Sequence, residues 1–594
     1  MISNSDSSYS KVESSPYAPV VINVENGEVV HQRILLIYGR AGPQDMNFES
    51  KITVEHHVNN FPSTTWQVFN SHFKCLVHLD AGLNNIKFIL DTSPFSSDSR
   101  PLTTIFQVNY VPLLQNPPLN LAILVAKDSK EIIDAPEEKE NSGENKLESV
   151  KAKLRCAGYL WQAFTAEQMS RNGFEEDSYT LKQILDPDIA QQNPNGVDDK
   201  KKDLYSIFMD SLKEYGAPFD KQCYVAGLIL DSHYDTSPNM GFIRGHAALG
   251  GGWDNIRLGI FGSHLTHAWP RYLEEVVSCF QDNTITDENR LSNDAGESGT
   301  WWRCCNIGIG AFLHEVEPNN SFPTTPSEEE GAHWYRSNVI RFRYHPCFRL
   351  PFEPPEKIDL KNIGADFWIL NKFLLIKCSA GISLIEIYVR NNIIGYLDYS
   401  DEYNQTEIRL KVDEIIKKYG GKYNIIKMNF VAKNQTETFL ENLQKFSEES
   451  KIILPIYGKV FKSNYLGKID ESLTEFKILF KKFIDTKPIT LKRMIIKYDV
   501  VINSITFYWS DNTNLRIGID DDEGIKKEFL FEEGEKIVKI KVNSGWYIDG
   551  FEIKTNLGRR SKWFGGHGGS KHTLEAPDNE YEMIGLYGTG KLFC

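Results

Sequence analysis

Residues 307–316 read Ile-Gly-Ile-Gly-Ala-Phe-Leu-His-Glu-Val, a short apolar stretch of helical character that ends in a histidine and a glutamate. Around it, from Leu119 to about Pro355, apolar runs alternate with segments of helical spacing. Residues 121–126 and 224–230 are continuous apolar runs, which is typical of strands buried on both faces. Apolar residues between these runs recur at helical spacing (Val150, Leu154, Ala157, Trp161 and Phe164). The alternation predicts an α/β or α+β core, where an enzyme would carry its site.

The pair His314-Glu315 has the chemistry of half a zinc-peptidase motif. In H-E-x-x-H the histidines share one helical face, so two imidazoles hold Zn²⁺ while the Glu activates the bound water. A longer form, H-E-x-x-H-x-x-G-x-x-H, adds a Gly and a third His. Aligned on the pair, the sequence has Pro318, Ser321 and Thr324 at the positions of the second His, the Gly and the third His. Only the His-Glu pair therefore matches the motif, and the other three motif positions do not.

Four stretches of the sequence are distinctive in their residues, their order and their spacing: residues 245–254 (GHAALGGGWD), 261–270 (FGSHLTHAWP), 311–316 (AFLHEV) and 341–348 (RFRYHPCF). They resemble a fungal family of zinc metallopeptidases that carry a C-terminal jacalin-like lectin domain, and the resemblance extends over about residues 20–450. It implies a metzincin-type fold, a zinc cofactor and a peptide substrate. His314 would be a metal ligand, and Glu315 the catalytic base. The family motif ends in Pro-His, and Pro323 preserves the first of these residues.

Departures from the family pattern argue against catalysis. Pro318 would stop the helix that presents the second ligand. Metzincins also need a Met in a turn beneath the metal, and no Met lies between Met240 and Met428. The resemblance puts the neighbouring histidines around the metal rather than on it (His246, His264, His267, His333 and His345). One imidazole binds zinc poorly, since tight sites use three or four ligands. We therefore expect zinc in the family and a lost site here, unless the gene model omits half of the motif.

Short strands are predicted on both sides of this core. From Pro19 to about Pro118, alternation such as Phe73, Cys75 and Val77, with Pro, Gly and Asn between the runs, indicates a β-sandwich. After the core, residues 382–389 read as a strand and residues 437–450 as a helix. The acidic residues 134–144 are predicted to be a solvated loop. A helix is expected to start at Trp269, with Pro270 in its first turn.

Three further motifs lie near the end of the sequence: residues 494–507, 544–559 (SGWYIDGFEIKTNLGR) and 563–566 (WFGG). They resemble a jacalin-like β-prism, with a β-turn at residues 556–558. Such lectins hold sugar between a Gly-rich loop and a G-x-x-x-D loop, whose Asp accepts hydrogen bonds from hydroxyls. Four residues after Gly590 the sequence has Cys594 instead of Asp, and the last strand of the prism is expected to be missing. Gly545 and Asp549 have the same spacing but are predicted to be structural, because they lie in an internal strand pair. The carbohydrate-binding residues therefore stay unassigned.

Composition narrows the classes of partner. The chain has 594 residues and a net charge of -14, which argues against nucleic acid or an anionic membrane surface. No run of apolar residues is long enough to predict a membrane helix. Nine scattered cysteines without a C-x-x-C pair indicate reduced core thiols rather than a disulfide framework or a zinc ribbon. The polar, Ser-rich start lacks the features of a signal peptide, so we expect a cytoplasmic protein.

The sequence therefore predicts a multidomain α+β chain. Its regions are a disordered tail (1–16), a β-sandwich (17–118), a metallopeptidase-like domain with a metzincin-like α/β core (119–355), a β-rich extension of the peptidase region (356–454) and a jacalin-like lectin domain (455–594). The leading hypothesis is a metallopeptidase homologue without catalytic activity that binds glycans or glycoproteins. Two alternatives stay open. One is an active zinc endopeptidase with replaced ligands, and the other is an intracellular scaffold whose prism recognises protein.

Overall fold

A computed structural model of the chain divides into two compact units, Met1–Glu353 and Pro354–Cys594, and each is described by itself. The structure describes residues 15–44, 47–56, 61–93, 101–174, 184–185, 190–192, 203–236, 242–253, 255–316, 333–349, 360–400, 405–420, 425–450, 452–454, 456–467, 472–485, 487–519, 524–590 and 592–593. Residues 1–14 of the predicted tail and residues 317–332, which decide the zinc motif, lie outside these ranges, as does Cys594.

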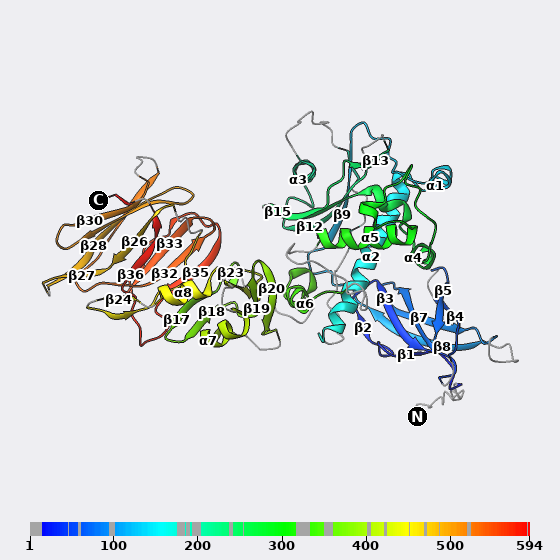
Figure 1. Cartoon of the computed structure of the whole chain (residues 1–594), viewed down its shortest axis with the longest axis horizontal. Helices are drawn as coiled ribbons and strands as arrows, with labels where there is room; N and C mark the ends of the chain where they lie inside the picture. Colours follow the sequence, from blue (N-terminus) through cyan, green and yellow to red (C-terminus); the bar gives the residue numbers. More distant parts are fainter. Residues whose placement is uncertain are drawn as a thin grey trace, which may run out of the picture. The chain divides into compact units, whose positions relative to one another are not determined.

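The first unit begins with a sheet of eight strands: β1 (Val20–Val21), β2 (Val29–Val30), β3 (Ile34–Arg40), β4 (Ser50–His56), β5 (Thr64–Phe69), β6 (His72–His78), β7 (Gly82–Leu90) and β8 (Leu102–Tyr110) (Figure 1). Their hydrogen-bonded order is β1-β3-β6-β5-β4-β7-β8-β2. Every second residue is buried along most of β6 and β7, as period-2 alternation predicts. The ring centroids of Phe73 in β6 and Phe88 in β7 lie 5.6 Å apart, although strands β5 and β4 lie between β6 and β7 in the sheet. One continuous sheet therefore folds over a single core.

A mostly parallel sheet forms the centre of the rest of this unit. Its order is β10 (Ile184–Leu185), β9 (Leu119–Val125), β12 (Cys223–Ile229), β16 (Ile256–Gly262) and β15 (Leu249–Trp253), with β11 (Ala190–Gln192) also on β9. β15 runs antiparallel to β16 and forms one edge. All of β9 is buried, and so is β12 except for Tyr224, which confirms the two strands predicted from continuous apolar runs. A short hairpin, β13 (His233–Asp235) and β14 (Phe242–Arg244), lies between β12 and β15 in the sequence.

Six helices belong to the described part of this unit. They are α1 (Glu137–Ser142), α2 (Leu147–Arg171), α3 (Leu204–Tyr215), α4 (Val276–Phe280), α5 (Trp301–Val316) and α6 (Arg336–Arg343), with 3-10 turns η1 (Ser263–Ala268), η2 (Leu273–Glu275), η3 (Asp294–Gly296) and η4 (Pro346–Phe348). Of these helices, α2, α3 and α5 contact the central sheet. The indole N–H of Trp161 in α2 donates to the carbonyl of Ile309 in α5 at 2.8 Å. The Trp161 ring also meets Phe312 edge-on at 5.0 Å. These contacts confirm the helix predicted around Trp161 and join it to the helix that ends in His-Glu. Among the described helices, none combines the length and the apolar character needed to cross a membrane.

Two predictions in this unit are wrong. The acidic residues 134–144 contain α1 rather than forming only a solvated loop, and the Glu140 carboxylate pairs with Arg290 at 2.9 Å. The ion pair gives the segment a tertiary partner that composition does not reveal. The helix expected from Trp269 begins only at η2 and α4, because the backbone at Trp269 and Tyr272 is still extended.

The second unit starts with two small sheets over one core. One contains β17 (Asp366–Leu370), β18 (Phe373–Lys377) and β21 (Glu407–Lys411), and the other β20 (Asn392–Asp398), β19 (Ile382–Val389), β22 (Ile426–Ala432) and β23 (Glu437–Leu440). Short helices are α7 (Val412–Ile415), the turn Ile416–Gly420 and α8 (Leu443–Glu449). The helix predicted for residues 437–450 is therefore partly wrong, because β23 pairs with β22 and α8 begins only after the cap at Asn442. β24 (Ile452–Leu454) and β25 (Gly458–Val460) form the connecting hairpin.

Three sheets around one core form the prism. The first pairs β26 (Thr474–Leu479) with β36 (Gly585–Gly590). The second has the order β27 (Lys481–Ile484), β28 (Lys487–Tyr498), β29 (Ile502–Trp509), β30 (Asn514–Gly518) and β37 (Leu592–Phe593), with β31 (Ile525–Leu530) also on β28. The third has the order β34 (Phe564–Gly565), β33 (Ile548–Thr555), β32 (Ile537–Ser544) and β35 (Ser570–Glu575). The sequence leads us to expect a missing last strand, yet in the structure β36 and β37 are both paired, and β37 lies along β30.

The eight cysteines that the structure describes are unbonded, and seven of them are buried, so these seven lie in the core as predicted. The predicted turn at residues 556–558 is also confirmed. Gly558 has a φ of 79°, and its N–H donates to the carbonyl of Thr555 at 3.0 Å.

Candidate functional site

Helix α5 carries His314 and Glu315 on its last turn, and close packing fixes where that turn lies. A Cβ at Gly259 in β16 would collide with the carbonyl of Glu315, so glycine allows the helix end to touch the sheet. The fully buried ring of Phe312 stacks on Phe261 of β16 at 5.6 Å. The sheet and the helix therefore hold the His-Glu pair in one position.

The two side chains of the pair have different surroundings. The carboxylate of Glu315 accepts a hydrogen bond from the backbone N–H of Gly250 in the edge strand β15, and burial raises the pKa of Glu315. The Nδ1 atom of His314 is buried and has no hydrogen-bond partner among the described residues. A carboxyl group with a raised pKa beside an exposed sheet edge has the environment of a general base. His314 offers one ring nitrogen that is free to bind.

The described residues around His314 do not form a zinc site. Within the ranges that the structure describes, no group of three His, Cys, Asp or Glu side chains is arranged to hold a metal ion. The sequence has no His between His314 and His333. His345 instead caps η4, where its Nδ1 accepts from the N–H of Cys347 at 3.3 Å, and burial lowers the pKa of His345 to about 3. His246 and His264 contact each other, with ring centroids 4.4 Å apart, and form a separate cluster.

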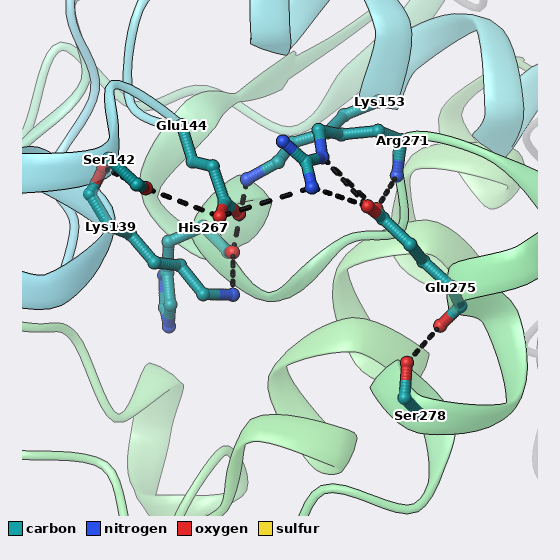
Figure 2. Close-up of polar contacts among 8 residues, drawn as sticks. All are labelled: Lys139, Ser142, Glu144, Lys153, His267, Arg271, Glu275 and Ser278. Carbon is teal, nitrogen blue, oxygen red and sulfur yellow. Dashed lines mark hydrogen bonds and ion pairs between the residues drawn. The ribbon is translucent and has the colours of Figure 1, made fainter.

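The buried side chain of Lys153 lies next to η1, the turn that carries His264 and His267 (Figure 2). Lys153 in α2 is 1% exposed, and its ammonium donates to the carbonyl of His267 at 3.1 Å. Lys139 in α1 donates to the same carbonyl at 2.8 Å. Around them Arg271 makes an ion pair with Glu275. Burial, helped by the charge of Lys139, lowers the pKa of Lys153 to about 7. The sequence analysis does not identify this network.

In the prism, two loops meet at Asp549. The turn from β32 to β33 contains Gly545 and leads to Asp549, and the loop before β35 contains Gly568 and Gly569. A Cβ at Gly569 would lie 2.6 Å from Asp549 Oδ2, and a Cβ at Gly568 would lie 3.4 Å from Oδ1. Oδ2 is buried without a hydrogen-bond partner in the described part of the chain. The structure thus brings a G-x-x-x-D loop and a Gly-rich loop together, which the sequence analysis sought only at Cys594.

Aromatic side chains occur on the chain segments that flank this carboxylate. Trp546 and Tyr547, between Gly545 and Asp549, are 71% and 70% exposed. In the Gly-rich loop, Trp563 and His567 are stacked with ring centroids 5.1 Å apart. A carboxylate next to exposed flat rings is suited to a polar ligand that also has apolar faces.

Comparisons with known proteins agree with both parts of the chain. Residues 18–184 and 176–317 match a family model described as "Putative peptidase family", and residues 480–593 match the "Jacalin-like lectin domain". "Putative zinc metalloproteinase C607.06c" of Schizosaccharomyces pombe is 29% identical and covers 96% of this chain and 97% of its own. "Putative zinc metalloproteinase YIL108W" of Saccharomyces cerevisiae is 28% identical, with 94% of this chain and 95% of its own covered.

Solved structures match the prism region. Wild-type Malaysian banana lectin is 17% identical, with a TM-score of 0.17, and covers 21% of this chain and 84% of its own. A mannose-binding jacalin-related lectin of Ananas comosus is 18% identical, with a TM-score of 0.15. The match covers 20% of this chain and 90% of the lectin. The peptidase family model spans half of the sequence, from residue 18 to residue 317. The chain therefore belongs to this peptidase family, and it carries a jacalin-like lectin domain in its second unit.

Proposed function

We propose that this protein binds carbohydrate at Asp549 in its jacalin-like domain and that its peptidase-family region does not cleave peptides. The observation that carries the proposal is the Asp549 carboxylate oxygen that lies against Gly568 and Gly569 without a hydrogen-bond partner among the described residues. A carboxylate only accepts hydrogen bonds, so the missing partner is a donor. Sugar hydroxyls are donors, and the glycines leave room for a sugar ring to reach the carboxylate.

The aromatic residues support the same assignment. Trp546 and Tyr547 are large and exposed, although burying such side chains is favourable. A sugar ring presents an apolar C–H face and a hydroxyl edge. The aromatic rings suit the face, and Asp549 suits the edge.

An Asp549→Asn variant of the full chain tests this site. We expect affinity for mannose or galactose oligosaccharides, measured by glycan array and then by calorimetry, to fall at least about tenfold. The reason is that a hydrogen bond to a charged group contributes about 1.5–3 kcal/mol. Asp511→Asn is the matched control, because Asp511 is exposed in the turn after β29 and only accepts from Thr513. Unchanged binding by Asp549→Asn, or no glycan binding by the wild type, would contradict the proposal.

The second half of the proposal concerns zinc. The relatives are named zinc metalloproteinases, which supports zinc in the family. In this chain, Pro318 and Thr324 stand where the family has histidines. The described ranges offer no group of three side chains arranged for a metal. We therefore infer a metzincin-like scaffold in which α5 and the edge strand β15 remain while the metal site is lost.

One observation favours the alternative of an active endopeptidase. Glu315 has a raised pKa and contacts the edge strand through Gly250, beside which an extended peptide would pair. Metal analysis of the dialysed protein separates the two cases. We expect well under one zinc per chain, and no change in His314→Ala. Stoichiometric zinc that is lost in His314→Ala, together with cleavage of a denatured protein, would establish the alternative.

A further inference from the structure

A cavity of about 350 Å³ lies in the first unit, between the β13–β14 hairpin and the loop before α5. The hairpin contributes an apolar and aromatic wall, and the loop contributes polar side chains. The hairpin side is lined by Tyr234, Phe242 and Ile243, and the loop side by Glu288, Asn293 and Asp294. None of them belongs to the His314–Glu315 pair or to the prism.

The loop side of the cavity consists of hydrogen-bond acceptors. Glu288 and Asp294 supply carboxylates. The amide N–H of Asn293 donates to Glu288 at 2.6 Å, which orients the Asn293 side chain. Asn293 Oδ1 is then buried and has no partner in the described part of the chain. One acceptor of the wall, Asn293 Oδ1, is therefore left without a donor within the described ranges.

Two arginines near the cavity form ion pairs with other carboxylates. Among the described residues that line the cavity there is no Lys or Arg. Arg244, beside Phe242, makes an ion pair with Asp235. Arg290, next to the loop, pairs with Glu140 at 2.9 Å. The cavity thus keeps a net negative wall.

A buried histidine stands behind the carboxylate of Asp294. His264 is 1% exposed, and its Nε2 is directed at Asp294 Oδ2 from 3.8 Å, beyond hydrogen-bond length. Neither ring nitrogen of His264 has a hydrogen-bond partner among the described residues. The closeness of His264 lowers the pKa of Asp294, so the group stays a carboxylate at neutral pH. Burial lowers the pKa of the next ring, His246, to about 4, so His246 is neutral there. On the cavity side of Asp294, Asn293 Oδ1 is the buried acceptor that has no donor among the described residues.

We propose that this cavity binds a primary alkylammonium group, as carried by a lysine side chain or a free aliphatic amine. Three acceptors, from Glu288, Asn293 and Asp294, match the three N–H donors of an ammonium. Tyr234 adds aromatic surface, which attracts cations, whereas the Phe242 ring already contacts Arg244. Ile243 adds surface for a methylene chain. The volume is near the lower end of ligand cavities, about 300–1,000 Å³, so it suits a group of side-chain size.

Calorimetry on the full chain tests the chemistry with pentylamine and with 1-pentanol, which has the same length but no charge. We expect pentylamine to bind and pentanol to bind at least about tenfold more weakly, because charged hydrogen bonds are about twice as strong as neutral ones. A lysine-containing tetrapeptide and its norleucine counterpart then identify the source of the group. Binding of the lysine peptide supports a protein side chain, and binding of pentylamine without the peptide supports a free amine.

Variants tie the binding to this cavity. Glu288→Gln and Asp294→Asn should each weaken pentylamine binding at least tenfold, and Glu288→Gln tests the site even if Asp294→Asn disturbs His264. Glu148→Gln is the control, because that carboxylate lies on α2 with its side chain 83% exposed. Equal binding of pentanol and pentylamine, full affinity in Glu288→Gln, or no binding of any amine would overturn the proposal.

Discussion

Replacing Lys153 by Met should stabilise the first unit. The ammonium of Lys153 is buried, and burial lowers the pKa of Lys153 from 10.5 to about 7. That difference is roughly 3.5 pH units, and at about 1.36 kcal/mol per unit it corresponds to about 5 kcal/mol against the folded state at low pH. The variant also loses the hydrogen bond to the His267 carbonyl, worth about 1 kcal/mol, although Lys139 still donates there. Met has nearly the shape of Lys, so we expect a net gain of about 3 kcal/mol.

The pH dependence has a definite sign. Unfolded Lys153 binds a proton below pH 10.5, whereas the folded protein binds it only near pH 7. The wild type therefore loses stability as the pH falls from about 10.5 to about 7 and changes little from this group below that. The gain in Lys153→Met should be small at pH 10 and full at pH 7.

Urea unfolding at pH 7 and pH 10, with hydrogen exchange read on α2, measures this difference. Lys151→Met is the control, because Lys151 pairs at 2.9 Å with the exposed Glu148 on the same helix. The Glu148 side chain is 83% exposed, although that of Lys151 is 17% exposed, so the pair contributes about 1 kcal/mol or less. A Lys153→Met variant that is less stable than the wild type, or a gain that does not change with pH, would refute the reasoning.

Three further variants test other contacts. Gly569→Ala should reduce both glycan binding and the melting temperature of the second unit, because Gly569 has a φ of 66° and a Cβ would collide with the backbone of β32; normal values of both would contradict the geometry. Trp161→Phe removes the indole donor to the Ile309 carbonyl, which keeps its helical hydrogen bond, and should cost about 1 kcal/mol in urea unfolding; no loss would mean that the indole bond does not stabilise the fold. His572→Leu removes the buried partner of Asp366 and should cost about 3–5 kcal/mol, with calorimetry showing a lower or split transition of the second unit, and an unchanged transition would argue against the pair.

Much of the fold follows from patterns that are local in sequence. Continuous apolar runs identify β9 and β12, since strands buried on both faces leave no polar alternation. The acidic helix α1 is missed because its composition is that of a solvated loop, and its ion-pair partner Arg290 is far away in the sequence. The strand β23 is missed because pairing with β22 outweighs the helical spacing of its residues.

The candidate sites also combine features that a local motif reveals with contacts that form only when distant residues come together. The pair His314-Glu315 is readable from a motif, but its contact with Gly250 depends on the packing of a helix on a sheet. Asp549 has the correct spacing after Gly545, yet its glycine neighbours come from a loop about twenty residues later, brought beside it by the pairing of β32 with β35. Lys153 is missed because a charged residue reads as exposed, although it directly precedes the buried Leu154 on the helix.

The pair of Asp366 and His572 has a consequence for anyone who wants to transplant the lectin into another protein. Asp366 Oδ1 meets His572 Nδ1 at 3.1 Å, and Asp366 Oδ2 accepts from the N–H of Thr573. The backbone N–H of Asn464 also donates to the carbonyl of Phe367 at 2.9 Å, so strand β17 is tied to the prism at two places. A gene fragment cut at residue 455 would leave His572 facing solvent and β17 behind. The smallest transferable piece of this molecule is therefore the whole stretch from about residue 360 onward, and the segment before the prism travels with the lectin.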